Sequence, residues 1–118
     1  KANVSEIMNI IGDVRGKRVG LVDDLIDTGG TIVNAANALA EIGAVEVFAC
    51  CTHSVLSGPA LERIRHSAIR ELVTLNTITL PPEKRIPQIR VLSVGDVMAD
   101  AIERIFGDLS ISTLFTQL

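Results

Sequence analysis

Three carboxylates and a Gly-Gly pair lie close together in the segment Val22-Asp23-Asp24-Leu25-Ile26-Asp27-Thr28-Gly29-Gly30-Thr31. Asp23 and Asp24 follow the apolar run 19–22, which is typical of a buried strand. The stretch 28–31 precedes a helical apolar pattern, so its free backbone N–H groups and the helix dipole suit an anion such as phosphate. Because carboxylates repel phosphate, we expect Asp23 and Asp24 to face sugar hydroxyls or a Mg²⁺ ion. The segment therefore predicts a site for a phosphorylated sugar.

Two other glycine-containing phosphate motifs are absent. The sequence has no Gly-x-x-x-x-Gly-Lys run, as in nucleoside triphosphate P-loops, and no Gly-x-Gly-x-x-Gly run, as in dinucleotide sites. An ordinary strand–helix turn would account for Thr-Gly-Gly-Thr alone. It would not account for two acids directly after a buried strand, so we favour the binding site.

The hydrophobic pattern outlines the elements that must hold these residues. Strands are predicted over 18–22, 45–51, 71–75 and 90–94, and helices over 4–11, over 32–42, from about 57–59 onward and over 97–106. A strand, a helix and a strand at this spacing form a βαβ unit, whose strands are parallel. We therefore expect an α/β fold with a parallel sheet in a three-layer α/β/α arrangement.

The composition limits the classes of partner. The 118 residues carry a net charge of −3 and no basic stripe, which argues against nucleic acid. No apolar run approaches the roughly 20 residues that span a membrane. Cys50 and Cys51 are adjacent and read as buried thiols in a reducing compartment, so we expect a cytoplasmic protein. No further Cys or His has the spacing of metal ligands.

Apolar residues make up 47% of the chain, and only three residues, all Phe, are aromatic. This composition suits parallel strands covered on both faces. It also suits a piece of a larger protein whose apolar surface is buried by another domain. Because the first residue is Lys1, we expect a second domain upstream.

The acidic glycine-rich segment resembles the ribose-phosphate-binding signature of the type I phosphoribosyltransferase fold. More narrowly, the chain is similar to the ribose-phosphate pyrophosphokinase (phosphoribosyl pyrophosphate synthetase) family, in its C-terminal part. The other matching motifs are Asn9-Ile10-Ile11-Gly12-Asp13-Val14, Thr52-His53-Ser54-Val55-Leu56-Ser57-Gly58, Asn76-Thr77-Ile78 and Ser110-Ile111-Ser112-Thr113-Leu114-Phe115.

The resemblance implies transfer of diphosphate from ATP to ribose 5-phosphate, with Mg²⁺ as cofactor. It implies that Asp27, Thr28, Gly29, Gly30 and Thr31 cradle the 5-phosphate, Asp27 mainly through its backbone. Asp23 and Asp24 would hold the ribose hydroxyls and help to organise magnesium through the substrate. No residue of this chain is predicted to be catalytic, because the family's ATP pocket and its mobile Lys/Arg loop lie upstream.

The resemblance also divides the chain. Residues 1–93 would form the ribose 5-phosphate-binding, phosphoribosyltransferase-like domain, incomplete at its N-terminus. Residues 94–118 would form a C-terminal helix and tail that pack on the missing N-terminal domain. Ser110, Ser112 and Phe115 match a regulatory phosphate and ADP site between subunits, although a frayed polar terminus would explain them equally well. The family assembles as dimers within hexamers, so a homo-oligomer is expected.

Three interpretations stay open. Besides the synthetase, the chain could belong to a phosphoribosyltransferase that joins a base to phosphoribosyl pyrophosphate, or to a non-catalytic regulatory relative of the synthetase.

His53, at the end of a predicted strand, suits either acid–base work or a simple hydrogen-bonded role. His66 reads as a solvated surface residue. The chain alone is expected to bind ribose 5-phosphate weakly and to turn nothing over.

Overall fold

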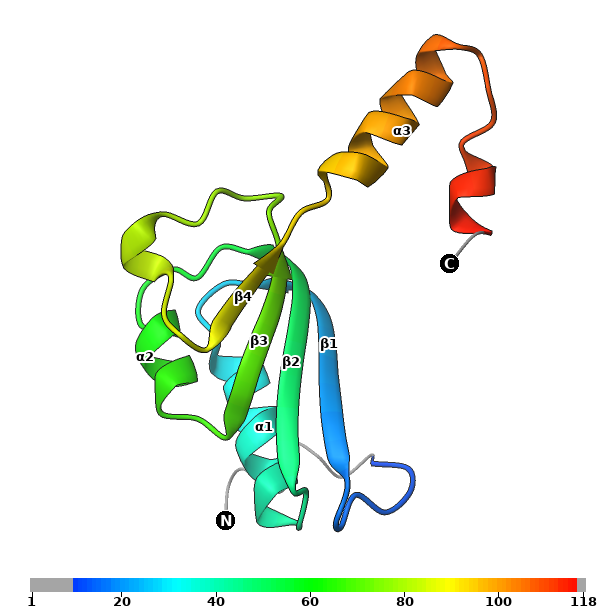
Figure 1. The fold of residues 1–118 in the computed structure, drawn as a ribbon. Helices are drawn as coiled ribbons and strands as arrows, with labels where there is room; N and C mark the ends of the chain where they lie inside the picture. Colours follow the sequence, from blue (N-terminus) through cyan, green and yellow to red (C-terminus); the bar gives the residue numbers. More distant parts are fainter. Residues whose placement is uncertain (1–9, 117–118) are drawn as a thin grey trace.

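The computed structural model describes residues 10–116, which form an α/β fold around one parallel sheet with the strand order β1-β2-β3-β4 (Figure 1). The strands are β1 (Arg18–Ile26), β2 (Glu46–Ser54), β3 (Ile69–Leu75) and β4 (Ile89–Leu92). The α-helices are α1 (Gly30–Glu41), α2 (Ala60–Arg65) and α3 (Gly95–Phe106), and the 3₁₀ turns are η2 (Pro82–Lys84) and η3 (Ser112–Phe115). The predicted α/β class with a parallel sheet is confirmed. The helix predicted over 4–11 falls almost wholly on residues 1–9, outside the described part, and residues 10 and 11 are not helical.

Strand β1 is longer than the sequence pattern predicts. It was expected to end at Val22, but it continues to Ile26 because its pairing with β2 continues through Asp23↔Cys51 and Leu25↔His53. Asp23 and Asp24 are therefore strand residues, and the loop begins only at Asp27. A period-2 apolar pattern cannot show this, since ladder hydrogen bonds are made by the backbone whatever the side chains are.

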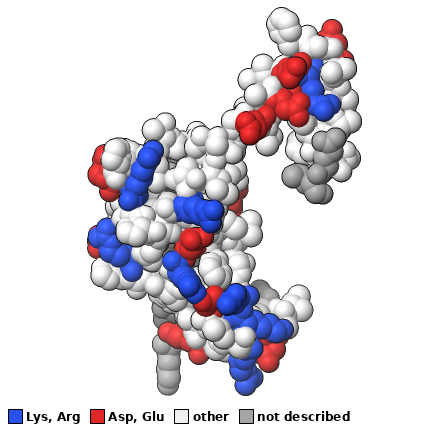
Figure 2. All heavy atoms as spheres, viewed as in Figure 1, with Lys and Arg blue, Asp and Glu red and all other residues white. Residues whose placement is uncertain are grey.

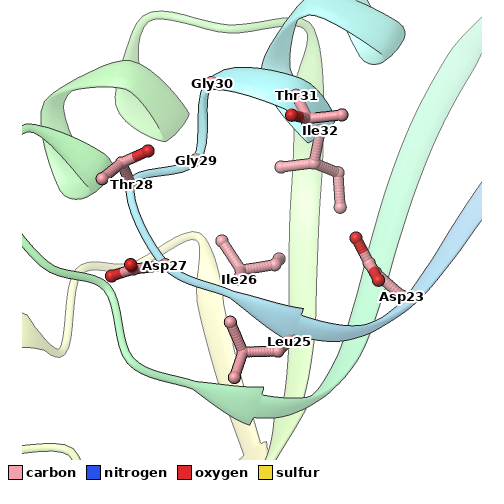
Figure 3. Close-up of a pocket in the computed structure, with 9 residues that line it drawn as sticks. All are labelled: Asp23, Leu25, Ile26, Asp27, Thr28, Gly29, Gly30, Thr31 and Ile32. Carbon is pink, nitrogen blue, oxygen red and sulfur yellow. The ribbon is translucent and has the colours of Figure 1, made fainter.

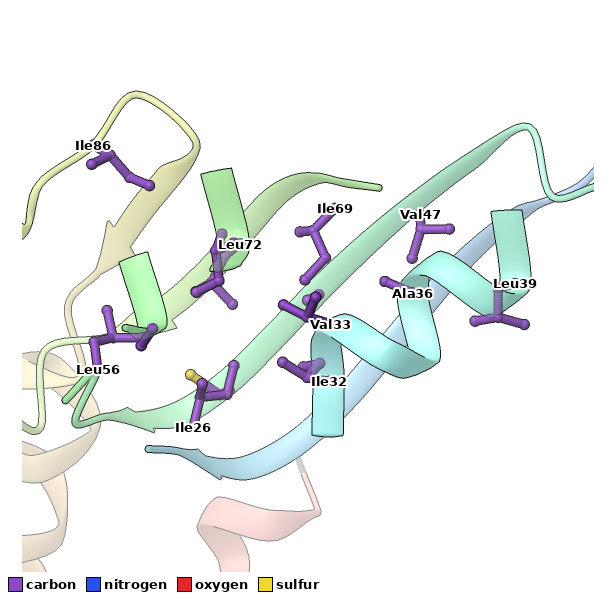
Figure 4. Packing of buried hydrophobic residues seen from close by; sticks show 14 of the residues in the cluster. Ile26, Ile32, Val33, Ala36, Leu39, Val47, Leu56, Ile69, Leu72 and Ile86 are labelled. Atoms are coloured by element: carbon purple, nitrogen blue, oxygen red, sulfur yellow. The ribbon is translucent and has the colours of Figure 1, made fainter. Parts of the chain in front are cut away.

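The core lies between the sheet and the helices α1 and α2. On β2 the alternate side chains Val47, Ala49 and Cys51 are buried, as expected where successive residues point to opposite faces. Helix α1 contributes apolar residues at helical spacing to the same cluster: Ile32, Val33, Ala36 and Leu39 (Figure 4). Helix α2 adds Ala60 and Ile64. This packing fixes the start of α1 against the carboxyl end of β1.

The opposite face of the sheet is bare within the described residues. Val22 is 82% exposed, and Cys50 and Val73 are only half-buried beside it. Together with Leu75 they line a shallow, mostly apolar depression. The predicted three-layer arrangement is therefore incomplete here: residues 10–116 supply helices for one face of the sheet, and the second helix layer is not formed by them.

Helix α3 leaves the sheet and projects away from it with the tail (Figure 1). The radius of gyration is 17.0 Å, against about 13–14 Å for a compact chain of this length. Figure 2 shows acidic groups with a smaller basic area among uncharged atoms over this projecting part, and Lys and Arg mixed with acids over the rest of the visible face. Among the described residues, no helix is long and apolar enough to cross a membrane.

Candidate functional site

A cleft of about 240 Å³ opens at the carboxyl end of β1, where the strand passes into α1. It is lined by Asp23 and by residues 25–32 (Figure 3). Parallel sheets bind ligands at this edge, because the loops that follow the strands meet there. The predicted loop therefore lines a concave surface.

The backbone of this loop is held from behind by the segment that follows β2. The carbonyl oxygen of Ile26 accepts hydrogen bonds from the N–H groups of Val55 (3.0 Å) and Leu56 (3.1 Å). The carbonyl oxygen of Asp27 accepts one from the N–H of Ser57 at 3.0 Å, and the Ser57 hydroxyl also donates to the Asp27 carboxylate. These bonds fix the first two peptide planes of the loop.

The third carbonyl of the loop is held by a side chain. Arg63, from α2, donates from Nη1 to the carbonyl oxygen of Thr28 at 3.0 Å. No residue of the segment 55–63 lines the cleft, so all three carbonyls point to the side away from it. In a trans peptide the N–H points opposite to the C=O, so the N–H groups of Asp27, Thr28 and Gly29 point away from 55–63.

These three N–H groups have no partner among residues 10–116. Consecutive N–H groups that point the same way form an anion-binding concavity, and the free N–H groups of the first turn of α1 extend it. The α1 dipole also favours a negative charge here. The cleft is thus built to accept an anion with several oxygens, such as phosphate.

Gly29 is required for this geometry by its backbone conformation, whereas a Cβ at Gly30 would make only an ordinary contact. Gly29 has φ +78°, a conformation that L side chains rarely adopt, and a Cβ there would lie 3.6 Å from Cα of Ala60. A Cβ at Gly30 would lie 3.4 Å from Nη1 of Arg63. The positive φ of Gly29 therefore allows the loop to curl beside α2.

The structure separates the three predicted carboxylates. Asp23 lies across the cleft from Thr28, whereas the Asp27 side chain turns away from the cleft towards Ser57 (Figure 3). Asp24 does not line the cleft, although its backbone N–H donates to Oδ1 of Asp23 at 2.8 Å. This arrangement fits a backbone role for Asp27 and a direct ligand role for Asp23 more than for Asp24.

The two histidines lie outside the cleft. His53 Nδ1 is 2.7 Å from the hydroxyl of Thr77, and that hydroxyl donates to the carbonyl of Thr52. This bonding favours the simple hydrogen-bonded role over acid–base work. His66 is exposed and pairs with Glu62 at 3.3 Å, as expected for a surface residue.

The predicted regulatory residues lie in the projecting tail, far from the cleft (Figure 1). The hydroxyls of Ser110 and Ser112 are 2.6 Å apart. Phe115 lines a separate, mostly apolar hollow of about 500 Å³ between α3 and η3. Of the three, Phe115 lines this hollow and Ser110 and Ser112 do not.

Among residues 10–116, no group of three or more His, Cys, Asp or Glu side chains is placed to hold a metal ion. Both cysteines are unpaired thiols; Cys51 is buried as predicted, whereas the prediction is wrong for Cys50, which is half-buried because it points to the bare face of the sheet. Burial raises the pKa of the Cys51 thiol, so this side chain is an inert part of the core.

Sequence reasoning missed Ser57 and Arg63, which hold the loop from behind. The motif Ser57-Gly58-Pro59 signalled a helix start but not its contact with a loop thirty residues earlier. Arg63 stands among other charged residues on a short helix, where nothing in the spacing distinguishes it.

Comparison with known proteins gives a consistent picture. Residues 2–116 match the family described as "Phosphoribosyl synthetase-associated domain". Ribose-phosphate pyrophosphokinases are similar over 115 residues: that of Clostridium perfringens is 64% identical and that of Bacillus caldolyticus 60%, each match covering 98% of this chain and 36% of the relative. The crystal structure of phosphoribosylpyrophosphate synthetase from Mycobacterium smegmatis matches with a TM-score of 0.80 and 45% identity, over 83% of this chain and 33% of that one. The chain therefore spans about a third of the length of these relatives, and it belongs to the phosphoribosyl synthetase-associated domain family.

Proposed function

We propose that this chain supplies the ribose 5-phosphate half of the active site of a ribose-phosphate diphosphokinase, which transfers diphosphate from ATP to ribose 5-phosphate to make phosphoribosyl pyrophosphate. One observation carries the proposal. The three carbonyls at 26–28 are all held away from the cleft, which turns the N–H groups of 27–29 the other way, and Asp23 lies across the cleft from them. A phosphate and a hydroxyl-bearing sugar are the two chemical groups that such a pair of surfaces binds together.

Each half of the ligand has its own set of groups. The backbone of Asp27 to Gly29 and the first turn of α1 would bind the 5-phosphate, with the hydroxyls of Thr28 and Thr31 free among residues 10–116 to add hydrogen bonds. Asp23 would accept hydrogen bonds from the ribose hydroxyls. Catalysis then rests on positioning and charge neutralisation, which phosphoryl-type transfer requires more than covalent help.

The carboxylates of this segment could also supply some of the ligands of a Mg²⁺ ion. Carboxylate oxygens are the ligands that Mg²⁺ prefers, and this ion usually shares its coordination with substrate oxygens and water. Asp23 would hold the ion together with the substrate. Asp24 lies outside the cleft and would contribute through its N–H bond to Asp23. When bound, the ion would neutralise charge on the diphosphate.

The rest of the enzyme belongs to the same proposal. The ATP site would lie in a part of the parent protein upstream of Lys1, which places this chain at the C-terminal end. Residues 1–93 would form the sugar-phosphate domain, and 94–118 would pack on the missing domain, with Ser110, Ser112 and Phe115 in a regulatory site between subunits. A Lys/Arg-rich segment encoded directly upstream of Lys1 would support the placement, and a parent protein that begins at Lys1 would contradict it.

A cytoplasmic location and a homo-oligomer complete the proposal. Two free thiols, Cys50 and Cys51, fit a reducing compartment. The exposed apolar residues of α3 and of the bare sheet face fit burial by other domains or subunits.

Titration calorimetry tests the binding function directly. Ribose 5-phosphate should bind the chain weakly, inorganic phosphate more weakly still, and ribose or free purine and pyrimidine bases not at all. Gly29→Ala should abolish the binding, because φ +78° strains any side chain there. Gly16→Ala is the matched control, since Gly16 also has a positive φ (+70°) but lies outside the cleft, with no atom within 4 Å of its Cβ position.

The alternatives give different results. Binding of a base in the presence of phosphoribosyl pyrophosphate would favour a phosphoribosyltransferase. Absence of any ribose 5-phosphate binding would favour the non-catalytic relative. The purified chain should make no phosphoribosyl pyrophosphate from ATP and ribose 5-phosphate, and measurable synthesis would refute its assignment as half of a site.

A further inference from the structure

We propose that Arg63 is a positioning residue of the anion site: its guanidinium holds the Thr28–Gly29 peptide plane so that the Gly29 N–H faces the cleft. The inference rests on the proposed function, because it assigns a role within the ribose 5-phosphate site. The proposed function uses residues that line the cleft, whereas Arg63 does not line it.

The contact itself is specific. Nη1 of Arg63 donates to the carbonyl oxygen of Thr28 at 3.0 Å, across 35 positions of sequence. The carbonyls of Ile26 and Asp27 are held by backbone N–H groups, which a substitution cannot remove. The carbonyl of Thr28 is held by a side chain. Among the three carbonyls at 26–28, the carbonyl of Thr28 is therefore the one whose hydrogen bond in the described residues depends on a side chain.

The spacing around the loop supports a built contact. A Cβ at Gly30 would lie 3.4 Å from Nη1 of Arg63, and a Cβ at Gly29 would lie 3.6 Å from Cα of Ala60, the first residue of α2. The loop therefore lies at contact distance from α2, with the guanidinium of Arg63 directly beside Gly30.

The charge of Arg63 is not used elsewhere. Within the described part of the chain, Arg63 forms no ion pair, whereas Arg65 of the same helix pairs with Glu62 at 2.7 Å. A hydrogen bond from a charged donor is stronger than a neutral one and polarises the peptide that accepts it. The Gly29 N–H on the other end of that peptide becomes a better donor to an anion.

The substitutions Arg63→Ala and Arg63→Lys test this role, with Arg65→Ala as the matched control. Calorimetry with ribose 5-phosphate and with inorganic phosphate should give about tenfold weaker affinity for Arg63→Ala, the value of one charge-assisted hydrogen bond. Arg63→Lys should be intermediate, because an ammonium offers a donor without the planar fork. Arg65→Ala should change either affinity less than twofold.

Chemical rescue separates positioning from a general loss of stability. Millimolar methylguanidinium should restore much of the affinity of Arg63→Ala and leave Arg65→Ala unchanged. Wild-type affinity in Arg63→Ala, or an affinity loss that methylguanidinium leaves untouched, would overturn the proposal.

A ligand-free measurement keeps the inference distinct from the proposed function. In ¹⁵N relaxation, the Gly29 amide should have an order parameter near 0.85 in the wild-type chain and below about 0.6 in Arg63→Ala, with Gly43 unchanged as an internal control. An unchanged Gly29 value would overturn the positioning role. A wild-type chain that binds neither phosphate compound would refute the proposed function, while the Gly29 value would still decide whether Arg63 holds the loop.

Discussion

Helices α1 and α3 have the same length, 12 residues, and opposite surroundings. Helix α1 buries five apolar residues, all but Ala38 within the core cluster: Ile32, Val33, Ala36, Ala38 and Leu39. Helix α3 has an equally regular apolar stripe and buries none of it, and Phe106 at its end is 93% exposed. Periodicity thus predicts that a helix forms and which face is apolar, but not what covers that face.

The two faces of the sheet repeat the contrast. One face packs against α1 and α2, and the other exposes Val22 and half-exposes Cys50 and Val73. Apolar surface of this extent usually marks an interface. Among residues 10–116, no segment buries the bare face or the apolar side of α3.

The largest expected effect contrasts the two helices directly. Leu39→Ala should lower the free energy of unfolding by about 2–4 kcal/mol, because Leu39 is 6% exposed and its loss leaves a cavity. Ile102→Ala should change it by less than about 0.5 kcal/mol, because Ile102 is 62% exposed and Ala is a better helix former. Urea unfolding followed by circular dichroism measures both. Equal losses would show that α3 packs on the sheet in solution.

The next effect compares the two faces of β2. Alkylation by iodoacetamide at pH 8 should modify Cys50 about tenfold faster than Cys51, since burial raises the pKa of the Cys51 thiol and blocks access. Because folding raises the pKa of this thiol above its ordinary value of 9.0, its contribution to the free energy of unfolding is complete below pH 9.0. That contribution is lost as the pH rises through the pKa of the thiol in the folded state. Stability should therefore decline above pH 9.0, and Cys51→Ala should flatten that decline. Equal labelling rates would contradict the contrast between the faces.

A smaller effect concerns how the tail is attached to α3. Arg104 joins them: Nε lies 3.1 Å from Asp100, and Nη1 donates to the Ser110 carbonyl at 3.2 Å and the Thr113 hydroxyl at 2.6 Å. Arg104→Ala should accelerate hydrogen exchange at the Leu114 amide about fivefold to tenfold, the equivalent of roughly 1 kcal/mol. Amides of β2 should be unaffected. Faster exchange throughout the sheet would mean that α3 and the sheet unfold together.

The smallest effect tests how well the packed region satisfies its polar groups. The hydroxyl of Ser54 is buried without a partner among residues 10–116, so Ser54→Ala should leave the stability unchanged or raise it by up to about 1 kcal/mol. The matched control is Thr74→Val, at a buried hydroxyl that does have partners in Cys51 and Leu75. That change should cost about 1 kcal/mol. Thermal unfolding measures both changes. A clear loss of stability in Ser54→Ala would show that the Ser54 hydroxyl does make a stabilising hydrogen bond.

Much of the architecture was predictable from local patterns. Helix α1 and its end before Gly43, whose φ is +107°, follow the apolar spacing and the glycine stop, and β2 is an interior strand as its continuous apolar run indicates. The position of the loop residues 27–31 at the carboxyl edge of the sheet also followed from the pattern. Strand ends did not: β1 runs on through Asp23 and Asp24, because pairing with β2 depends on the backbone of another segment.

By itself, the sequence determined that a strand, a glycine-rich turn and a helix would meet at one edge of a parallel sheet, because strand and helix periods and glycine stops are local properties. Only the tertiary structure decided that the cleft faces Asp23 rather than Asp24, and that Ser57 and Arg63 hold the loop from behind. Those contacts join residues 30 and 35 positions apart, and no local pattern encodes which side of a strand or loop a distant segment will cover.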